Sequence, residues 1–259
     1  MIIDTHCHAG LNWFEPLDVL LYQMKTNGVS KAVLIQHRGV FDNSYLIKAA
    51  SKYPKTFKVC GIVNPNESNP IQKLSQLKSD GVSGIRLNNN EMFLGVQSEE
   101  FIRAAGDLEM VISYHGTVEF FASNNFKNII EKCPETKIIM EHLAGVGFLP
   151  HPYTLYKSAL ECSVFQNASI KIPGLGEFSK RPKVLQPSLK FEEIPPFIEM
   201  AYEKFGADRM MWGSDFPPCA GREGYKNALN GIKHHEIFRS IEDQNKVMGQ
   251  TAAKVWGFD

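Results

Sequence analysis

The stretch Ile2-Ile3-Asp4-Thr5-His6-Cys7-His8 predicts a first buried strand that ends in two histidines. Side chains two residues apart in a strand point to the same face, about 6.5 Å apart along it. The imidazoles of His6 and His8 can therefore turn toward one point. Parallel α/β folds bind their ligands at the carboxyl ends of their strands, where this pair falls. The pattern predicts a ligand site at the end of the first strand.

Seven further strands are predicted from apolar runs that end at turn residues or charged groups. After the first strand they cover residues 32–36, 57–64, 84–88, 110–115, 137–142, 168–172 and 209–213. The early strands recur at roughly the 30-residue length of one βαβ unit. Eight such units indicate an α/β protein of the (β/α)8 TIM-barrel class. A doubly wound open sheet is the alternative, but it usually stops at about five or six strands.

Amphipathic helical segments separate the predicted strands. They cover residues 16–28, 42–54, 70–81, 98–109, 120–133, 153–162, 195–205, 224–234 and 243–256. The segment 173–194, after the seventh strand, is rich in glycine, proline and charge and is long for a connection. A long loop at the mouth of a barrel is typical of a lid.

Composition indicates an ordinary globular chain and limits the classes of molecule that it is expected to bind. The chain has 259 residues, is 43% hydrophobic, and carries 28 basic and 28 acidic residues. We expect a single domain over residues 1–259. We also expect a small molecule as partner, because proteins that bind nucleic acids or anionic membranes usually carry an excess of basic residues. No apolar run approaches the roughly 20 residues that span a bilayer. With no leader pattern and five widely spaced cysteines, we expect a cytoplasmic protein with reduced thiols. Assembly into a homo-oligomer is compatible with the sequence.

Polar and titratable residues occupy the carboxyl ends of the predicted strands. They are His6 and His8, His37 and Arg38, Arg86, His115, Glu141 and His142, Lys171, and Asp215 in Gly213-Ser214-Asp215-Phe216-Pro217. No GxGxxG or GxxxxGK[ST] motif is present, so the sequence does not indicate a dinucleotide or P-loop phosphate site. These strand ends are the predicted active site.

Four of these residues suit one divalent ion. His6, His8, His115 and Asp215 provide three nitrogens and one oxygen, a set that favours Zn²⁺ or a similar metal. Such an ion acidifies water toward a pKa of about 7. Asp215 is the predicted base, and His142 is predicted to polarise the substrate carbonyl or to relay a proton to the leaving group.

Cationic residues at the predicted mouth suggest an anionic organic substrate. Arg86, Arg38 and Lys171 are candidates to bind a carboxylate, with His37 beside them. Glu177, in the loop after the seventh strand, is a candidate to hydrogen-bond substrate. Arg181 and Arg222, on neighbouring loops, could bind the same carboxylate, although the pattern favours solvated surface cations at these two positions.

The chain resembles the amidohydrolase superfamily in four motifs that occur in consistent order. They are Asp4-Thr5-His6-Cys7-His8, Gly84-Ile85-Arg86-Leu87-Asn88, Glu141-His142-Leu143-Ala144-Gly145 and Trp212-Gly213-Ser214-Asp215-Phe216-Pro217. The likeness is to the amidohydrolase-related branch of lactonases and decarboxylases. It implies a metal held by His6, His8, His115 and Asp215, with His142 as the catalytic histidine. Arg86 stands where dinuclear relatives carry a bridging lysine, which implies a mononuclear site, and some similar lactonases act without metal.

The reaction expected from these residues is hydrolysis of a lactone or similar small carboxylated ester ring by metal-activated water. Non-oxidative decarboxylation of a hydroxybenzoate- or muconate-semialdehyde-type acid is the alternative, since the two chemistries share ligands. A non-catalytic small-molecule-binding barrel is a third possibility from a different class. The motifs alone do not separate the first two.

Overall fold

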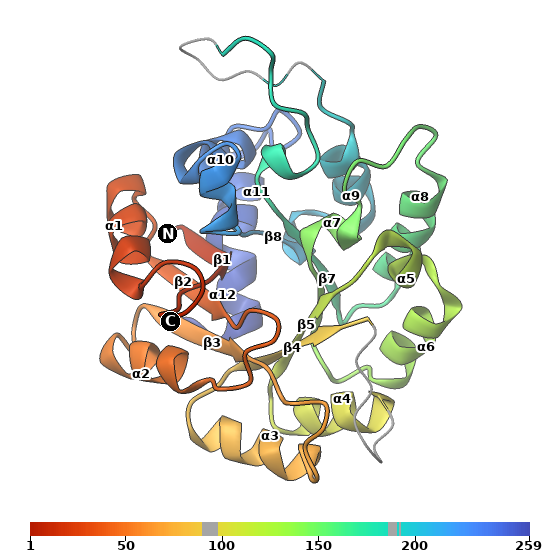
Figure 1. Cartoon of the computed structure of the whole chain (residues 1–259). Helices are drawn as coiled ribbons and strands as arrows, with labels where there is room; N and C mark the ends of the chain where they lie inside the picture. The colour runs from red at the N-terminus through yellow and green to blue at the C-terminus, as the bar shows by residue number, and fades with distance from the viewer. Residues whose placement is uncertain (90–97, 186–190, 192) are drawn as a thin grey trace.

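The computed structural model describes residues 1–89, 98–185, 191 and 193–259. Eight parallel strands follow one another in chain order around a nearly closed barrel (Figure 1). The strands are β1 (Ile3–Cys7), β2 (Lys31–Ile35), β3 (Phe57–Gly61), β4 (Gly84–Asn88), β5 (Val111–His115), β6 (Ile138–Met140), β7 (Ala168–Ile172) and β8 (Met210–Trp212). The predicted TIM-barrel architecture is confirmed.

Helices surround the strands and cover the outer face of the barrel (Figure 1). They are α1 (Leu17–Asn27), α2 (Ser44–Lys52), α3 (Pro70–Ser79), α4 (Ser98–Asp107), α5 (Val118–Ala122), α6 (Asn124–Lys132), α7 (His142–Gly145), α8 (Thr154–Leu160), α9 (Phe197–Phe205), α10 (Tyr225–Lys233), α11 (Ile241–Asn245) and α12 (Thr251–Trp256). Short turns are η1 (Glu161–Val164), η2 (Leu175–Glu177), η3 (Ala207–Arg209), η4 (Pro218–Gly221) and the π-helical η5 (Lys246–Gln250). No helix in the described residues is long and apolar enough to cross a membrane.

The barrel closes between β8 and β1 through the loop after β8. The backbone N–H of Asp215 donates to the carbonyl of His6 at 2.7 Å, and the N–H of His8 donates to the carbonyl of Phe216 at 2.8 Å. The pairing of β1 with β2 shifts register between Asp4 and Cys7. Because a bulge changes which side chains share a face, Ile3 and His6 can both face the barrel axis.

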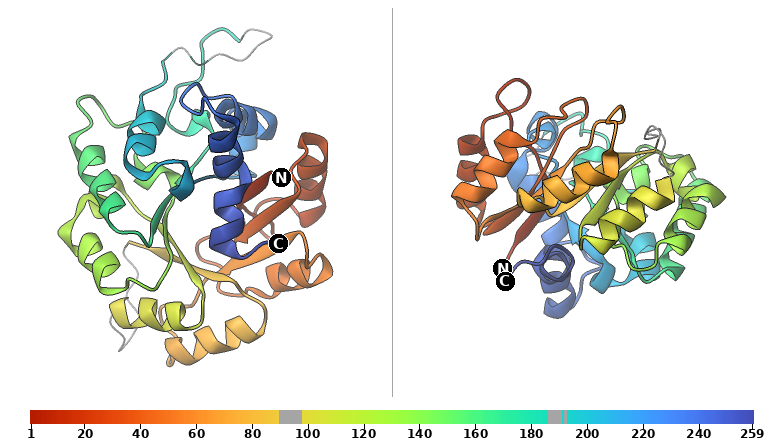
Figure 2. Two further views of the ribbon diagram at one scale, coloured as in Figure 1. Left: turned by 180° about the vertical axis from the view of Figure 1, so that it is seen from behind. Right: turned by 90° about the horizontal axis from the view of Figure 1, so that it is seen from below.

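The barrel interior has an apolar layer at the amino ends of its strands and a polar layer at the carboxyl ends. The apolar layer comprises Ile3, Val33, Ile35, Cys60, Val111, Ile139 and Met211, together with Ala252 and Trp256 of α12. Helix α12 lies across the amino ends of the strands (Figure 2). A separate, larger cluster fills the space between the strands and the outer helices. The apolar layer supports the polar site above it.

Boundaries of several elements differ from the sequence predictions. The predicted helix over 120–133 is two helices, α5 and α6, because the Ser123 hydroxyl accepts a hydrogen bond from the N–H of Phe126 and starts a new helix. The predicted strand over 57–64 ends at Gly61, and the strand over 209–213 contains only three paired residues. Part of the predicted lid, 186–190 and 192, lies outside the described residues.

Candidate active site

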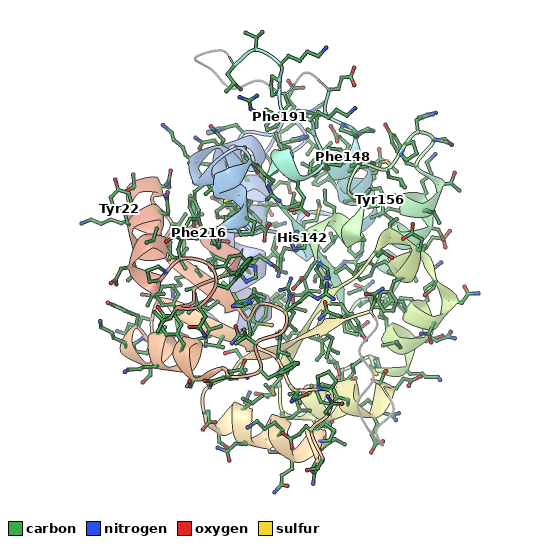
Figure 3. All side chains as sticks on the ribbon, in the orientation of Figure 1. Tyr22, His142, Phe148, Tyr156, Phe191 and Phe216 are labelled. Carbon is green, nitrogen blue, oxygen red and sulfur yellow. The ribbon has the colours of Figure 1, made fainter. Side chains whose placement is uncertain are left out.

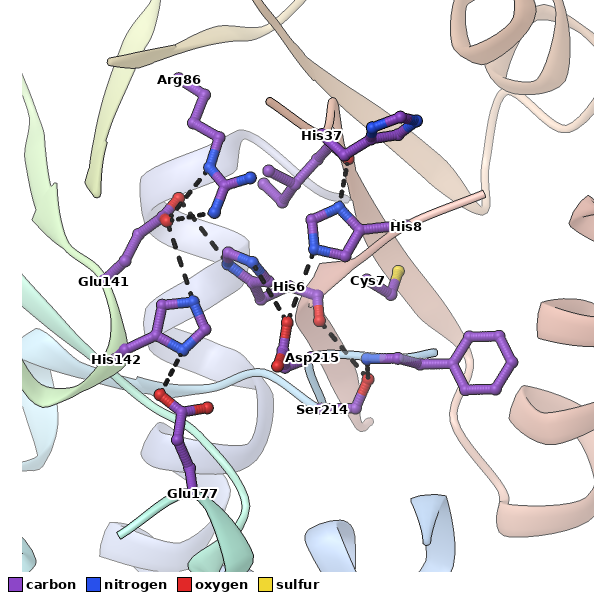
Figure 4. Close-up of polar contacts among 12 residues, drawn as sticks. His6, Cys7, His8, His37, Arg86, Glu141, His142, Glu177, Ser214 and Asp215 are labelled. Atoms are coloured by element: carbon purple, nitrogen blue, oxygen red, sulfur yellow. Dashed lines mark hydrogen bonds and ion pairs between the residues drawn. The ribbon is translucent and has the colours of Figure 1, made fainter. Parts of the chain in front are cut away.

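Three side chains converge at the carboxyl end of the barrel interior (Figure 4). The Asp215 Oδ1 atom lies 3.5 Å from Nε2 of His8 and 3.8 Å from Nε2 of His6. The three ligand atoms all lie within 4.8 Å of one another, and all three residues are buried. The structure thus brings together three of the four predicted metal ligands.

The Asp215 position is fixed by its neighbours rather than by a strand. Asp4 accepts hydrogen bonds from the N–H of Ser214 at 2.8 Å and from its hydroxyl at 2.6 Å. Tyr225 donates a further hydrogen bond to Asp4 at 2.9 Å. Asp215 itself has a φ of 54°, a left-handed conformation that costs of order 1–3 kcal/mol for a non-glycine residue and is concentrated at functional sites.

Both histidines of the pair are neutral at physiological pH. Burial lowers the pKa of His8, and burial together with the Lys171 charge lowers the pKa of His6 well below its ordinary value. The Nδ1 atom of His8 lies 2.7 Å from the carbonyl of Ile35, so a hydrogen on Nδ1 leaves Nε2 free to bind a ligand. Nε2 of His6 is buried and has no hydrogen-bond partner among the described residues.

A buried ionic network lies directly beneath this site. Arg86 donates to Oε2 of Glu141 from Nη2 at 2.9 Å and from Nε at 3.2 Å. Lys171 lies 3.9 Å from Oε1 of Glu141 and donates to the hydroxyl of Ser113 at 3.2 Å. Although burial opposes ionisation of Glu141, Arg86 and Lys171 hold the pKa of its carboxyl far below the ordinary value. Glu141 therefore offsets the charge of Arg86 and part of that of Lys171, whose pKa is lowered by burial.

His142 approaches the same point from the loop after β6, near the centre of the barrel (Figure 3). Its ring packs edge-on against His6, with 4.6 Å between ring centroids. Nδ1 of His142 lies 2.7 Å from Oε1 of Glu177, and its Nε2 lies 3.9 Å from Oε2 of Glu141. Burial lowers the pKa of His142, but Glu177, Asp215 and Glu141 outweigh burial and raise it. This ring is suited to exchange protons.

A cavity of about 550 Å³ opens above these residues. His37 and Arg38, which follow β2, line it, and the ring of Phe14 lies between His37 and His8 at 5.1 and 5.0 Å between centroids. His115 also lines the cavity, with its ring 5.9 Å from that of His142, and burial lowers its pKa to about 4. His115 belongs to no converging ligand set among the described residues, so its metal-ligand role stays a prediction.

The remaining predicted substrate contacts have protein partners. Arg86 lines the cavity but is paired with Glu141, and Lys171 is buried beneath His6. Glu177 contacts His142 and Arg222. The predicted substrate roles of these three residues are not tested by these contacts.

Sequence reasoning gave no firm role to two residues at the site. Glu141 was placed at a strand end without a role. Its position next to His142, at a strand end like that of Arg86, indicated that it belongs to the site. Arg222 was considered as a carboxylate-binding group but favoured as a surface cation; it lines the cavity and pairs with Asp215 at 3.2 Å.

A family model described as Amidohydrolase matches residues 3–258. The chain belongs to the amidohydrolase family. This confirms the resemblance carried by the four motifs and the prediction of a hydrolytic enzyme. The match extends over both the first histidine pair and the late aspartate, so the residues that converge in the fold lie within the family's own span.

This amidohydrolase is similar to characterised and solved proteins along most of its length. It is 27% identical to 4-sulfomuconolactone hydrolase of Rhizobium radiobacter over 261 residues, which cover 94% of this chain and 81% of that protein. The structure of a probable 2-pyrone-4,6-dicarboxylic acid hydrolase from Acinetobacter baumannii superposes with a TM-score of 0.76 at 18% identity over 99% of each chain. An amidohydrolase from Burkholderia multivorans solved with bound zinc gives a TM-score of 0.81 at 16% identity over the full length of both chains.

Proposed function

We propose that this amidohydrolase opens a small lactone ring that carries an anionic group. The observation that carries the proposal is the convergence of His6, His8 and Asp215 beside His142 at the floor of one cavity. The lactone hydrolase named above supports this choice of ring, since it is similar to nearly the whole chain.

The residues present fit a single divalent ion, and we propose Zn²⁺ held by His6, His8 and Asp215. Two ligands bound tetrahedrally at about 2.1 Å lie about 3.4 Å apart. The observed separations of 3.5 and 3.8 Å between the carboxylate and the two ring nitrogens are close to that spacing. The unpartnered Nε2 of His6 points to the same ligand. A bound ion would supply Lewis-acid polarisation of water and of the ester carbonyl.

The protein's own groups perform the proton transfers. Asp215 accepts a proton from the attacking water. Burial opposes its ionisation, but His8, His142 and Arg222 lower its pKa, so the carboxylate is ionised and able to accept. The water oxygen bonds to the lactone carbonyl carbon, and the ring carbon–oxygen bond breaks. His142 donates a proton from Nε2 to the departing ring oxygen. The product is a ring-opened hydroxy acid or its enol.

The distribution of charge around the cavity orients an anionic substrate. Asp215 and Glu177 lie on the β7–β8 side, whereas Arg38 and His37 lie on the β2 side. Arg38 is exposed and lines the cavity, so its guanidinium can meet a ligand there. We infer that the anionic group faces Arg38 and His37, while the ester faces Asp215 and His142.

An assay for ring opening tests this function. Purified protein, with and without added Zn²⁺, would be incubated with 4-sulfomuconolactone and with 2-pyrone-4,6-dicarboxylic acid, and products followed by NMR and by proton release. We expect a ring-opened acid. Asp215→Asn should lower the rate by about 10²–10⁴-fold, as for the loss of a general base. Asp208→Asn, whose carboxylate is exposed, is the matched control and should retain activity.

Other products would assign the other reactions. Release of CO₂ from a hydroxybenzoate, with no ring opening, would replace this proposal by the decarboxylase alternative. Saturable binding of the lactones without turnover would favour a binding barrel. Metal analysis of His6→Ala tests the ligand set separately, since unchanged zinc content would contradict it.

A further inference from the structure

Glu177 contacts the site in a way that substrate binding does not explain. Its Oε1 lies 2.7 Å from Nδ1 of His142 (Figure 4). Its Oε2 lies 3.2 Å from Nη1 of Arg222. Both carboxylate oxygens therefore already have partners within the protein. This arrangement favours a role in holding those partners.

The contact selects one tautomer of the His142 ring. The contact is a close ion pair and not an aligned hydrogen bond, but a lone pair on Nδ1 would be repelled by a carboxylate oxygen at 2.7 Å, whereas an N–H is attracted to it, so the hydrogen of the neutral ring belongs on Nδ1. Nε2 then carries the lone pair. Nε2 faces the barrel interior, on the side of Glu141, at 3.9 Å.

Arg222 links the same carboxylate to the second reacting group. Its guanidinium lies 3.2 Å from Glu177, 3.2 Å from Oδ2 of Asp215 and 3.4 Å from Glu223. A planar guanidinium fixes the relative directions of the groups that it binds. One cation thus connects Glu177, and through it His142, to Asp215.

The backbone that carries Glu177 is anchored on both sides. Leu175 is buried and packs against Gly231 of α10. Phe178 is buried and its ring meets Phe197 of α9 at 5.8 Å between centroids. Gly176 lies so close to Glu223 that a Cβ there would overlap Oε2 of that residue. The η2 turn is therefore held in place before any substrate arrives.

We infer that Glu177 is a positioning residue that fixes the tautomer and orientation of His142, and that Arg222 fixes the position of the Glu177 carboxylate relative to that of Asp215. The η2 turn, part of the loop predicted as a lid, is on this inference a fixed component of the catalytic centre. The inference rests on the proposed function for its catalytic meaning, but its structural claim is testable without substrate.

The decisive measurement is ¹⁵N NMR of histidine-labelled protein at a pH where the ring of His142 is neutral. The His142→Gln variant identifies the His142 signals among those of the eight histidines. In the wild type, we expect Nδ1 to be protonated and Nε2 to be unprotonated. In Glu177→Met, which removes the acceptor, we expect a mixture of tautomers. Glu203→Met makes the same substitution at an exposed residue of α9 and should leave the spectrum unchanged.

Kinetics on the lactone that the wild type opens provide the second readout. Loss of a group that orients a reacting side chain typically costs about 10–100-fold in activity. We expect this loss in kcat for Glu177→Met with KM nearly unchanged, and partial recovery in Glu177→Gln, whose amide oxygen still accepts from Nδ1. Because Arg222 acts through the same contact, the double variant Glu177→Met/Arg222→Met should lose less than the sum of the single losses.

The outcomes separate this inference from the proposed function. An unchanged His142 tautomer in Glu177→Met overturns the inference whether or not the protein opens lactones. A raised KM with unchanged kcat also overturns it, because that pattern indicates substrate binding by Glu177. If the wild type opens no lactone but the tautomer changes as expected, the proposed function fails and the positioning role stands.

Discussion

His142 lies between the carboxylates of Glu177 and Glu141, and this environment predicts how activity depends on pH. Burial lowers the pKa of His142, but Glu177, Asp215 and Glu141 together hold it above the ordinary 6.5. The protonated ring is the form that donates to the leaving oxygen. The rate should therefore fall as the pH rises through this raised pKa.

Removing the nearest of these charges should shift the profile. In Glu177→Gln the carboxylate that raises the pKa of His142 is gone, so the alkaline limb of kcat should move to lower pH. The measurement is kcat against pH for both proteins. Limbs that coincide would show that His142 is not the group whose protonation controls turnover.

Lys171 is placed to control how tightly the site holds a metal. Its Nζ lies 3.1 Å from Nδ1 of His6. An ammonium only donates, so it disfavours the tautomer with its hydrogen on Nδ1, which is the form that leaves Nε2 free to bind a metal. Metal-bound histidines typically donate from the other nitrogen to an oxygen acceptor. Lys171→Gln supplies such an oxygen, and we expect Zn²⁺ affinity to rise roughly tenfold or more.

Competition with a zinc-binding dye at fixed pH measures this affinity. Lys48→Gln, at an exposed position of α2, is the control for loss of one positive charge. Equal or weaker zinc binding by Lys171→Gln would show that the lysine does not oppose the metal.

At the residue scale, the sequence predicted groups that share a strand end but not those that pair across the barrel. His6 and His8 were found because their spacing matches one strand face, and Asp215 because a carboxylate follows the last strand. Glu141 and Arg86 lie 55 residues apart, and only barrel closure brings their charges together. A buried arginine requires such a partner, but sequence alone does not say which carboxylate provides it.

At the element scale, the turn that carries His142 is left-handed. His142, Leu143, Ala144 and Gly145 have φ values of 52°, 49°, 56° and 61°. Each non-glycine residue in this conformation costs roughly 1–2 kcal/mol. A Cβ on Gly145 would overlap the carbonyl oxygen of Gly116, which follows β5. The turn therefore depends on glycine for close approach to the neighbouring loop.

Gly145→Ala should move His142 away from the site. We expect destabilisation by about 1–3 kcal/mol, as for overpacking, and a loss of kcat that approaches 10²-fold, as for a displacement of about 1 Å. Gly147→Ala is the matched control: its φ is also positive, at 51°, but nothing lies within 4 Å of an added Cβ. Thermal unfolding and kcat are the measurements. Equal effects in both variants would mean that backbone strain, not the clash, is responsible.

Element types were predictable from periodicity, whereas element ends depended on contacts distant in sequence. The split between α5 and α6 depends on a single serine cap, and apolar residues on both sides of it, at Phe120 and Phe121 and again at Phe126, gave the impression of one helix. The last strand is short because the chain turns there to bind Asp4 and His6 through Ser214 and Asp215. These hydrogen bonds cross more than 200 residues of sequence.

At the scale of the whole molecule, the count of repeating units predicted the barrel, but not what fills its amino end. Helix α12 places Ala252 and Trp256 against the lower interior layer of the strands. Trp256 is buried and contacts Gly84 at the start of β4, where a Cβ would come within 2.8 Å of its ring. An amphipathic helix at the end of the chain shows that one face is buried, but not which surface it covers.

Trp256→Ala should destabilise the whole barrel while leaving the residues of the active site in place. Truncation of a buried tryptophan typically costs about 3–5 kcal/mol through lost burial and the cavity that remains. Denaturant unfolding measures this loss. Trp13→Ala is the matched control, because Trp13 is 67% exposed and such surface substitutions usually change stability by less than about 0.5 kcal/mol. In the folded fraction of Trp256→Ala, zinc content should match the wild type, since the polar layer lies at the opposite ends of the strands. A loss below about 1 kcal/mol would show that the amino end of the barrel does not need this side chain, because even cores that relax after truncation usually lose more.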